Sequence, residues 1–255
     1  MLSWLEIASS ILLSPAFLFE EPDWIFAMRS LKQGLIVALG ENDLEAAVAI
    51  VKHQRQALSV LIRIAYDKDT LAGWRAIKAI GLAAREMAKT DAEFLRETCR
   101  KLLWSLTDES GAIGWSAPEI LGEIVSAEPR RYPDIIPIIA GAYEVEEEVF
   151  RAGVVYALCR VAEAAPELAV TYQKIVMLSL ADKEPLVKVN GLELVGLLWP
   201  VAVRNNVWSL EYQERIRSAV QGLLSDRGEA WVYKGDDFLS IQVGEMASKV
   251  AKFIN

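Results

Sequence analysis

The sequence predicts an all-α fold, a right-handed α-solenoid of about six helix pairs that forms one domain over residues 1–255. Three observations lead to this prediction. A ten-residue pattern recurs five times, its apolar residues have helical periodicity, and helix breakers separate each copy from another amphipathic segment upstream. A repeat array reaches this length without one large core, because each unit packs only on its neighbours.

The recurring pattern marks the second helix of each pair. Every copy opens on an apolar residue and closes on two apolar or small residues followed by Gly or Cys. The five copies are Leu31–Gly40, Ala72–Gly81, Ile113–Gly122, Phe150–Cys159 and Val187–Gly196. They end at residues 40, 81, 122, 159 and 196, so successive copies are 41, 41, 37 and 37 residues apart. In the last copy Val187, Gly191 and Leu194 fall on one helical face.

The segments between the copies predict the first helix of each pair. These first helices are expected at Leu44–Tyr66, Ala92–Leu106, Ile135–Tyr143 and Leu168–Leu180. Capping residues support the boundaries, because short polar side chains favour helix N-caps and proline favours the first turn. The expected N-caps are Asp43, Thr70 and Asp91, and the expected first-turn prolines are Pro118, Pro133, Pro166 and Pro185.

Less regular segments at both ends are expected to cap the array. Leu2–Phe19 is predicted to be the first helix of repeat one; Glu6 interrupts its apolar run and no Lys or Arg precedes it, unlike a secretory signal. At the other end, residues 209–254 are predicted to form an irregular helix pair, Glu211–Leu224 and Asp237–Phe253, joined by a loop at Ser225–Asp236.

The second-helix pattern resembles that of HEAT repeats over residues 23–198. The resemblance rests on an apolar–basic opening followed by Ala-Leu or its equivalent before Gly, with an acidic residue five positions before the opening. It implies a HEAT-like solenoid in which acidic and basic side chains of successive repeats form a ladder. The ladder residues would be Asp67, Asp108, Asp182, Arg151 and Lys188. Gly73 and Gly114 replace the basic residue in repeats two and three, so the ladder is expected to be incomplete.

Composition argues against several functions. The formal charge of −8 and the pI near 4.9 disfavour nucleic acid as the main partner, because polyanion binding depends on Lys and Arg. His53 is the single histidine, and Cys99 and Cys159 lie in apolar helical patterns that favour buried thiols, so neither a metal nor another cofactor is expected. No apolar stretch is long enough for a membrane helix, and the chain is expected to be cytoplasmic.

Positions 3, 7 and 11 of the second helices are expected to line an exposed concave stripe, the usual binding face of solenoids. The binding residues predicted there are Trp74, Lys78, Trp115, Glu119, Tyr156, Arg160 and Glu193. The same count places Leu82, Glu123, Ala152, Val189 and Leu197 on the stripe.

Trp74 and Trp115 lie one repeat apart at equivalent positions, each directly after a glycine. Two exposed indoles would suit a binding hot spot. The alternative, which average tryptophan burial favours, is that they fill the space beside Gly73 and Gly114. The irregular segment Thr107–Glu119 likewise is either a binding loop or a longer helix–helix turn.

Acidic and aromatic clusters have simpler interpretations. Glu119 and Glu123 are one turn apart, but no nucleophile or metal-ligand spacing accompanies them, so a solvated acidic groove is favoured over a catalytic pair. Glu144 and Glu146–Glu148 suit a solvated helix N-terminus. The aromatic residues near the C-terminus are expected to cover the last repeat; they are Trp199, Trp208, Trp231 and Tyr233.

The leading functional hypothesis is a scaffold that binds a protein partner of unknown identity through its concave face. The alternative is a small-molecule or chromophore-binding lyase-like protein, or a DNA-glycosylase-like protein, as the HEAT resemblance implies. In the small-molecule version, a pocket between Trp74 and Trp115 would use Glu119 and Arg75 as polar contacts. No catalytic constellation is present in the sequence, which favours the scaffold.

Overall fold

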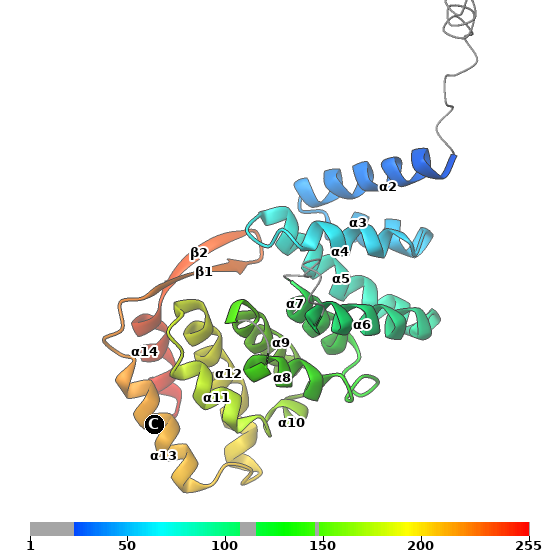
Figure 1. The fold of residues 1–255 in the computed structure, drawn as a ribbon. Helices are drawn as coiled ribbons and strands as arrows, with labels where there is room; N and C mark the ends of the chain where they lie inside the picture. The colour runs from blue at the N-terminus through cyan, green and yellow to red at the C-terminus, as the bar shows by residue number, and fades with distance from the viewer. Residues whose placement is uncertain (1–22, 108–115, 146–147, 255) are drawn as a thin grey trace, which may run out of the picture.

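The computed structural model describes residues 23–107, 116–145 and 148–254. Within these residues the chain is an all-α solenoid with one small two-stranded sheet (Figure 1). The α-helices are α2 (Asp23–Gly40), α3 (Leu44–His53), α4 (Ala57–Ala65), α5 (Leu71–Thr90), α6 (Ala92–Thr107), α7 (Ala117–Ala127), α8 (Ile136–Val145), α9 (Arg151–Ala164), α10 (Pro166–Ala169), α11 (Gln173–Leu180), α12 (Pro185–Arg204), α13 (Leu210–Gly222) and α14 (Val243–Ile254).

The helices form two layers that follow the same arc (Figure 1). The second helices of the pairs, α2, α5, α7, α9, α12 and α14, pack in chain order and form what we call the second-helix face. The first helices form the other layer, in which α3 and α4 together, α6, α8, α10 with α11, and α13 each precede a second helix. This is the arrangement of HEAT-like helix pairs.

Local sequence accounts for many of the helix boundaries. Asp43 accepts a hydrogen bond from the Ala46 amide (2.9 Å) and Thr70 accepts one from the Gly73 amide (3.1 Å), so both cap helices as predicted. Pro166 and Pro185 begin α10 and α12, and Pro118 lies in the first turn of α7. Pro133 precedes α8 instead of entering it. The predicted helix Leu44–Tyr66 is divided into α3 and α4 around Gln54.

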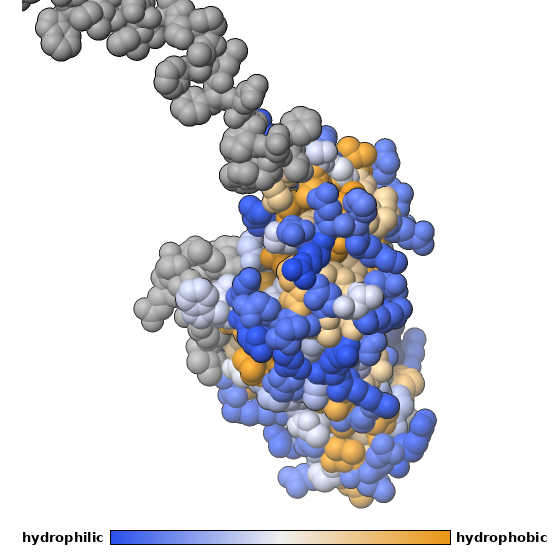
Figure 2. All heavy atoms as spheres, turned by 90° about the vertical axis from the view of Figure 1, so that its right-hand side faces the viewer, coloured by the Kyte–Doolittle hydropathy of each residue, from blue (hydrophilic) through white to orange (hydrophobic). Residues whose placement is uncertain are grey.

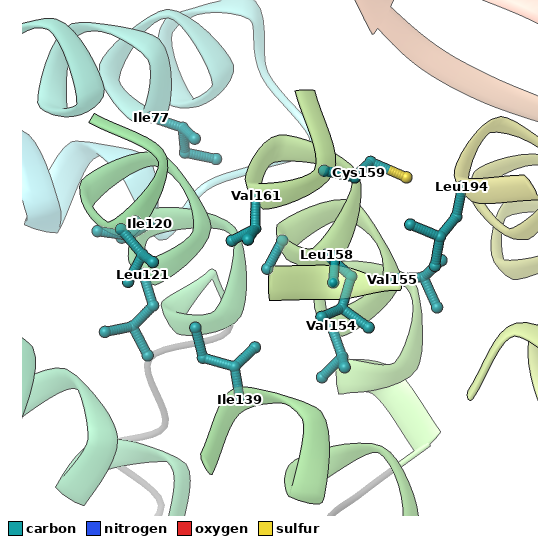
Figure 3. Packing of buried hydrophobic residues seen from close by; sticks show 14 of the residues in the cluster. Ile77, Ile120, Leu121, Ile139, Val154, Val155, Leu158, Cys159, Val161 and Leu194 are labelled. Atoms are coloured by element: carbon teal, nitrogen blue, oxygen red, sulfur yellow. The ribbon is translucent and has the colours of Figure 1, made fainter. Parts of the chain in front are cut away.

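Apolar side chains from consecutive second helices meet in a continuous core (Figure 3). Close helix approach requires small residues at several positions. A Cβ atom on Gly122 of α7 would lie 2.5 Å from the Ala157 Cα of α9, so α7 and α9 could not pack this closely with any larger residue there. The small residues that recur in the repeat therefore fix the distance between successive second helices.

The outer surface differs from this core. Hydrophilic side chains cover much of the side shown in Figure 2, and apolar patches lie both toward the end where α2 lies and toward the opposite end. In the described part of the chain, α12 alone is long and apolar enough to cross a membrane by length and composition. It packs between α9 and α14, and 56% of its apolar stretch is buried, so packing within the solenoid explains its composition.

The C-terminal segment differs from the sequence prediction. Residues 229–242, predicted as loop and helix, form a β-hairpin: β1 (Glu229–Lys234) pairs antiparallel with β2 (Asp237–Gln242), and α14 begins only at Val243. Two features explain the strands. β1 contains Trp231, Val232 and Tyr233 and β2 contains Phe238 and Ile241, residue types that favour strands. Gly235 takes a positive φ of 76° in a two-residue turn. The predicted helix pair is present as α13 and α14, but the hairpin lies between the two helices in the sequence.

Candidate functional site

The β-hairpin crosses the second-helix face from the C-terminal end toward the N-terminal repeats (Figure 1). Three contacts fasten its tip. The Tyr233 ring stacks on Trp74 of α5 with centroids 5.7 Å apart and planes 9° apart. The Asn42 amide donates to Asp236 Oδ1 at 2.6 Å, and Arg75 donates to the Asp236 carbonyl at 3.2 Å. A segment almost two hundred residues from Asn42 in sequence therefore covers the face that was predicted to be open.

Trp74 lies at the centre of an aromatic cluster. Tyr156 of α9 meets its ring edge-to-face at 5.2 Å, while Tyr233 covers its flat side. The indole is half-buried by these two rings. The structure thus places Trp74, predicted as an exposed anchor or a packing residue, in a packing role against the hairpin.

Beside the aromatic cluster, four polar residues form what we call the Glu123 cluster: Lys78, Glu123, Tyr156 and Arg160. Lys78 Nζ donates to Glu123 Oε1 (2.7 Å) and to the Tyr156 hydroxyl (2.6 Å). The Tyr156 hydroxyl donates to the same carboxylate at 2.5 Å, and Arg160 donates to both of its oxygens at 2.9 and 3.4 Å. Glu123 is only 3% exposed, so these contacts compensate for loss of its hydration.

The electrostatics of the Glu123 cluster favour a neutral phenol and a charged guanidinium. Burial raises the pKa of Tyr156 well above its ordinary value, and the adjacent Glu123 carboxylate raises it further. Burial alone would lower the pKa of Arg160, but the negative charge and hydrogen bonds of Glu123 outweigh it, so the pKa rises. Tyr156 is therefore a hydrogen-bonding group here and not a base.

One turn earlier on α7, Glu119 has a poorer environment. It is also 3% exposed, and Lys68 Nζ donates to its Oε1 at 3.0 Å. Its Oε2 is buried without a hydrogen-bond partner in the described structure. The Gly153 position of α9 faces this carboxylate, because a Cβ atom there would lie 2.5 Å from Glu119 Oε2.

The expectation of a solvated acidic groove was therefore wrong. Glu119 and Glu123 were predicted to be exposed on the concave stripe, yet both are buried and ion-paired to lysines of α5 or of the turn before it. Val189, predicted on the same stripe, is 1% exposed. The reason is that helical periodicity defines a face of one helix, whereas the neighbouring repeats and the hairpin decide how much of that face remains open.

The other predicted stripe residues are partly accessible. Lys78, Tyr156 and Arg160 come together around Glu123, as described, and Glu193 of α12 accepts from Lys234 of the hairpin at 3.3 Å. Trp115 and Asp108 lie outside the described residues, as does most of the predicted binding loop Thr107–Glu119. The proposed pocket between Trp74 and Trp115 therefore has no structural description, and its polar contacts are engaged elsewhere: Arg75 donates to the Leu39 and Gly40 carbonyls.

Of the predicted ladder residues, Arg151 and Lys188 lie in the first turns of α9 and α12, and Asp67 and Asp182 lie in turns between helices. Arg151 lies 3.5 Å from Asp182, which also accepts from the Tyr143 hydroxyl at 3.1 Å. Lys188 pairs with Asp226 at 2.7 Å, and this partner was not predicted. In the described part of the chain no ion pair joins Asp67 to another side chain. In both contacts a basic residue of one repeat reaches an acidic residue of the next.

Two cavities flank the hairpin tip. One has a volume of about 230 Å³ and lies toward α5 and α7; the other, of about 220 Å³, lies toward α9 and α12. Tyr233, Gly235, Lys78 and Arg160 line both, so the tip of the hairpin separates them. Sequence reasoning missed the hairpin residues of this site; the signal that could have found them was Gly235-Asp236 between two aromatic, β-branched runs.

Metal-ligating and thiol groups are arranged as follows. Within the described ranges no three His, Cys, Asp or Glu side chains gather as a metal site would require. Cys99 and Cys159 are buried free thiols, as predicted, and burial raises the pKa of Cys99 to about 12. A thiol with such a pKa is a poor nucleophile near neutral pH.

Comparisons with known proteins bear on the fold. No family model matches the chain, and a search of curated proteins found no match. Among solved structures it is similar to an engineered protein, with 14% identity and a TM-score of 0.51 over 88% of this chain and 96% of the other. An archaeal HEAT-like repeats protein from Thermococcus onnurineus aligns over the same shares, with 14% identity and a TM-score of 0.38. At 14% identity the likeness to the engineered protein concerns the fold alone, and the TM-score of the archaeal protein is too low to carry an argument. The order and packing of the helices in the structure itself make the chain an all-α solenoid of helix pairs.

Proposed function

We propose that this chain is a binding scaffold for a protein partner and that its own β-hairpin occupies the recognition surface in the free protein. The recognition surface consists of Trp74, Lys78, Tyr156 and Arg160 on the second-helix face, and Glu193 extends it toward the C-terminus. Solenoids of helix pairs commonly bind partners on this face.

The observation that carries the proposal is the stacking of Tyr233 on Trp74. A parallel aromatic pair contributes roughly 0.5–1.5 kcal/mol beyond the area it buries. Here one ring belongs to the solenoid and the other to an extended strand from another part of the chain. The hairpin is therefore an internal example of a segment that the surface can hold.

The hairpin also indicates the chemistry of the partner. Tyr233 fits against Trp74, and the next residue, Lys234, pairs with Glu193. An extended segment with an aromatic residue followed by a basic one would make the same two contacts. The chain's charge of −8 favours approach of such a basic segment.

The carboxylates support binding over catalysis. Glu119 and Glu123 are each held in an ion pair with a lysine, which favours a structural role over acid–base catalysis. The second-helix face also carries the carboxylates Glu123 and Glu193 beside Lys78 and Arg160. These negative charges disfavour binding of a polyanion such as DNA. A glycosylase-like role would need a predominantly basic surface.

The test uses a peptide with the sequence of residues 229–242, labelled with a fluorophore, and the full chain carrying Tyr233→Ala. This substitution removes the ring that covers Trp74. Fluorescence anisotropy should show binding of the peptide to Tyr233→Ala and much weaker binding to the wild type, whose surface is occupied. The matched control is the same peptide with its tyrosine replaced by alanine.

A second variant identifies the surface. Tyr233→Ala combined with Trp74→Ala should no longer bind the peptide, whereas Tyr233→Ala combined with Trp104→Ala, on the opposite helix layer, should bind it normally. Circular dichroism must first show that all variants are folded. The proposal fails if Tyr233→Ala does not bind the peptide, or if removal of Trp74 leaves binding unchanged.

A further inference from the structure

The cavity of about 230 Å³ between α5, α7 and the hairpin tip has an unusual charge for this protein. Three basic residues line it, Lys78, Arg85 and Arg160, against one carboxylate, Glu123. The whole chain, in contrast, carries a charge of −8. A hollow with an excess of positive charge in an acidic protein attracts anions locally.

The basic groups of this cavity are not all neutralised. Glu123 is shared by Lys78 and Arg160, so one carboxylate serves two cations. Arg160 also pairs with Glu163, which lines the other cavity. Lys78 donates two hydrogen bonds, to Glu123 and to the Tyr156 hydroxyl, although an ammonium group has three donors.

Arg85 is the least engaged of the three. It lies on α5, two turns after Lys78, and its side chain is exposed at the cavity. In the described part of the chain, no hydrogen bond or ion pair to Arg85 is present. Its planar guanidinium offers the paired donors that suit a carboxylate or a phosphate.

The remaining walls fit a small organic molecule. Leu44 and Leu82 provide apolar surface, and Tyr233 of the hairpin closes one side. The volume is below the roughly 300–1,000 Å³ of sites for drug-sized ligands, so the occupant must be small. We propose that this cavity binds a small organic anion whose carboxylate or phosphate group pairs with Arg85 and the third donor of Lys78.

The cavity shares Lys78 and Arg160 with the recognition surface for a protein partner, but Arg85 and Leu82 lie outside that surface. The cavity exists with the hairpin in place, so substitutions at Arg85 and Leu82 test this proposal separately. Its test is isothermal titration calorimetry of the full chain with two probes, citrate and glycerol 3-phosphate, at low ionic strength. We expect at least one probe to bind, and the stronger of the two identifies the preferred group. Binding should weaken as salt is added, because the contacts are ionic and partly exposed.

Two substitutions locate the site. Arg85→Ala should weaken binding by about tenfold or more, the effect expected for loss of a charge-assisted contact. Leu82→Glu should abolish it by placing a negative charge at the cavity. The matched control is Arg215→Ala, which removes another exposed arginine, on α13, and it should bind like the wild type.

Arg85 and Arg215 are both exposed, so neither Arg85→Ala nor Arg215→Ala should change the melting temperature appreciably. The proposal is overturned if neither probe binds to the wild type. It is also overturned if Arg85→Ala and Arg215→Ala weaken binding equally, because that result would show only a general response to charge. Neither outcome affects the peptide experiment on the hairpin.

Discussion

Glu119 and Glu123 lie one turn apart on α7 and are equally buried, but their surroundings differ. Glu123 accepts from three side chains, whereas Glu119 accepts from Lys68 alone and keeps one oxygen without a partner in the described structure. Both pay a similar desolvation cost on folding. The comparison shows that two equally buried carboxylates on adjacent turns of one helix can have different numbers of hydrogen-bond partners to compensate for their lost hydration.

The two surroundings differ because different elements supply them. Lys78 and Arg160 reach Glu123 from the second helices on both sides, α5 and α9. Lys68 reaches Glu119 from the turn before α5, and on the α9 side Gly153 offers no side chain. Glu123 of α7 therefore forms ion pairs with both the preceding and the following repeat, while Glu119 forms one ion pair, with the preceding repeat. Matched substitutions can test this distinction.

The largest expected effect is that of Glu123→Gln. The amide keeps the shape of the side chain but removes the negative charge that Lys78 and Arg160 share. Lys78 then loses its counter-charge, and Arg160 keeps only Glu163. We expect the free energy of unfolding to fall by about 3 kcal/mol. Urea unfolding followed by circular dichroism measures it.

The control for Glu123→Gln is Glu163→Gln, which removes the other, 40% exposed partner of Arg160. Surface ion pairs contribute little, so a loss below about 1 kcal/mol is expected. Equal losses in the two variants would contradict the central role of Glu123.

Alkaline pH should weaken the fold through the tyrosines. Burial raises the pKa of Tyr156 above its ordinary value of 10.0, and Glu123 adds to the shift. Above the pKa of the unfolded chain, the unfolded state releases this proton while the native state keeps it. The contribution of Tyr156 to stability is therefore constant below about pH 10 and falls as pH rises further.

The measurement is the ultraviolet absorbance of tyrosinate, recorded together with circular dichroism during an alkaline titration. The pKa values of the other tyrosines are raised too, chiefly by burial. Ionisation should thus coincide with unfolding. Ionisation at ordinary pKa values with the helices intact would show that the phenols are more accessible than the structure indicates.

Tyr156→Phe should have an intermediate effect. The ring and its edge-to-face contact with Trp74 remain, but Glu123 and Lys78 each lose a hydrogen bond. We expect a loss of about 1–2 kcal/mol in urea unfolding. Tyr66→Phe is the control, since the Tyr66 hydroxyl makes no hydrogen bond in the described part of the chain, and it should unfold like the wild type.

The sequence predicted the repeat well because repeat geometry depends on local signals. Caps such as Asp43 and Thr70, and small residues such as Gly122, act within a few residues or recur at a fixed period. These signals established the solenoid and the order of its helices. The first-helix break near Gln54 was not visible, because the apolar periodicity continues through it.

The site could be predicted only in part, because its contacts join distant segments. Periodicity placed Trp74, Lys78, Tyr156 and Arg160 on one face, and the structure brings them together. It could not show that the hairpin would cover that face. The burial of the carboxylates was also missed, although room for them is provided by Gly81 and Gly153 in neighbouring repeats.

The smallest effect is expected for Glu119→Gln, the same substitution one turn away from Glu123. The amide oxygen can still accept from Lys68, and the oxygen that is replaced has no partner to lose. Removing the charge also removes its desolvation cost, which offsets the weaker attraction. We expect a change of about 0–1 kcal/mol in the free energy of unfolding, well below that of Glu123→Gln.

Lys68→Met sharpens this last test, because it removes the cation and leaves the buried Glu119 charge in place. An uncompensated buried carboxylate is costly, so Lys68→Met should destabilise the chain more than Glu119→Gln does. The double variant should recover part of that loss, as the remaining charge is then absent. Suppose that Glu119→Gln lowered the free energy of unfolding as much as Glu123→Gln does. The number of hydrogen-bond partners would then not determine how much a buried carboxylate on α7 contributes to stability, and the distinction between Glu119 and Glu123 would be wrong.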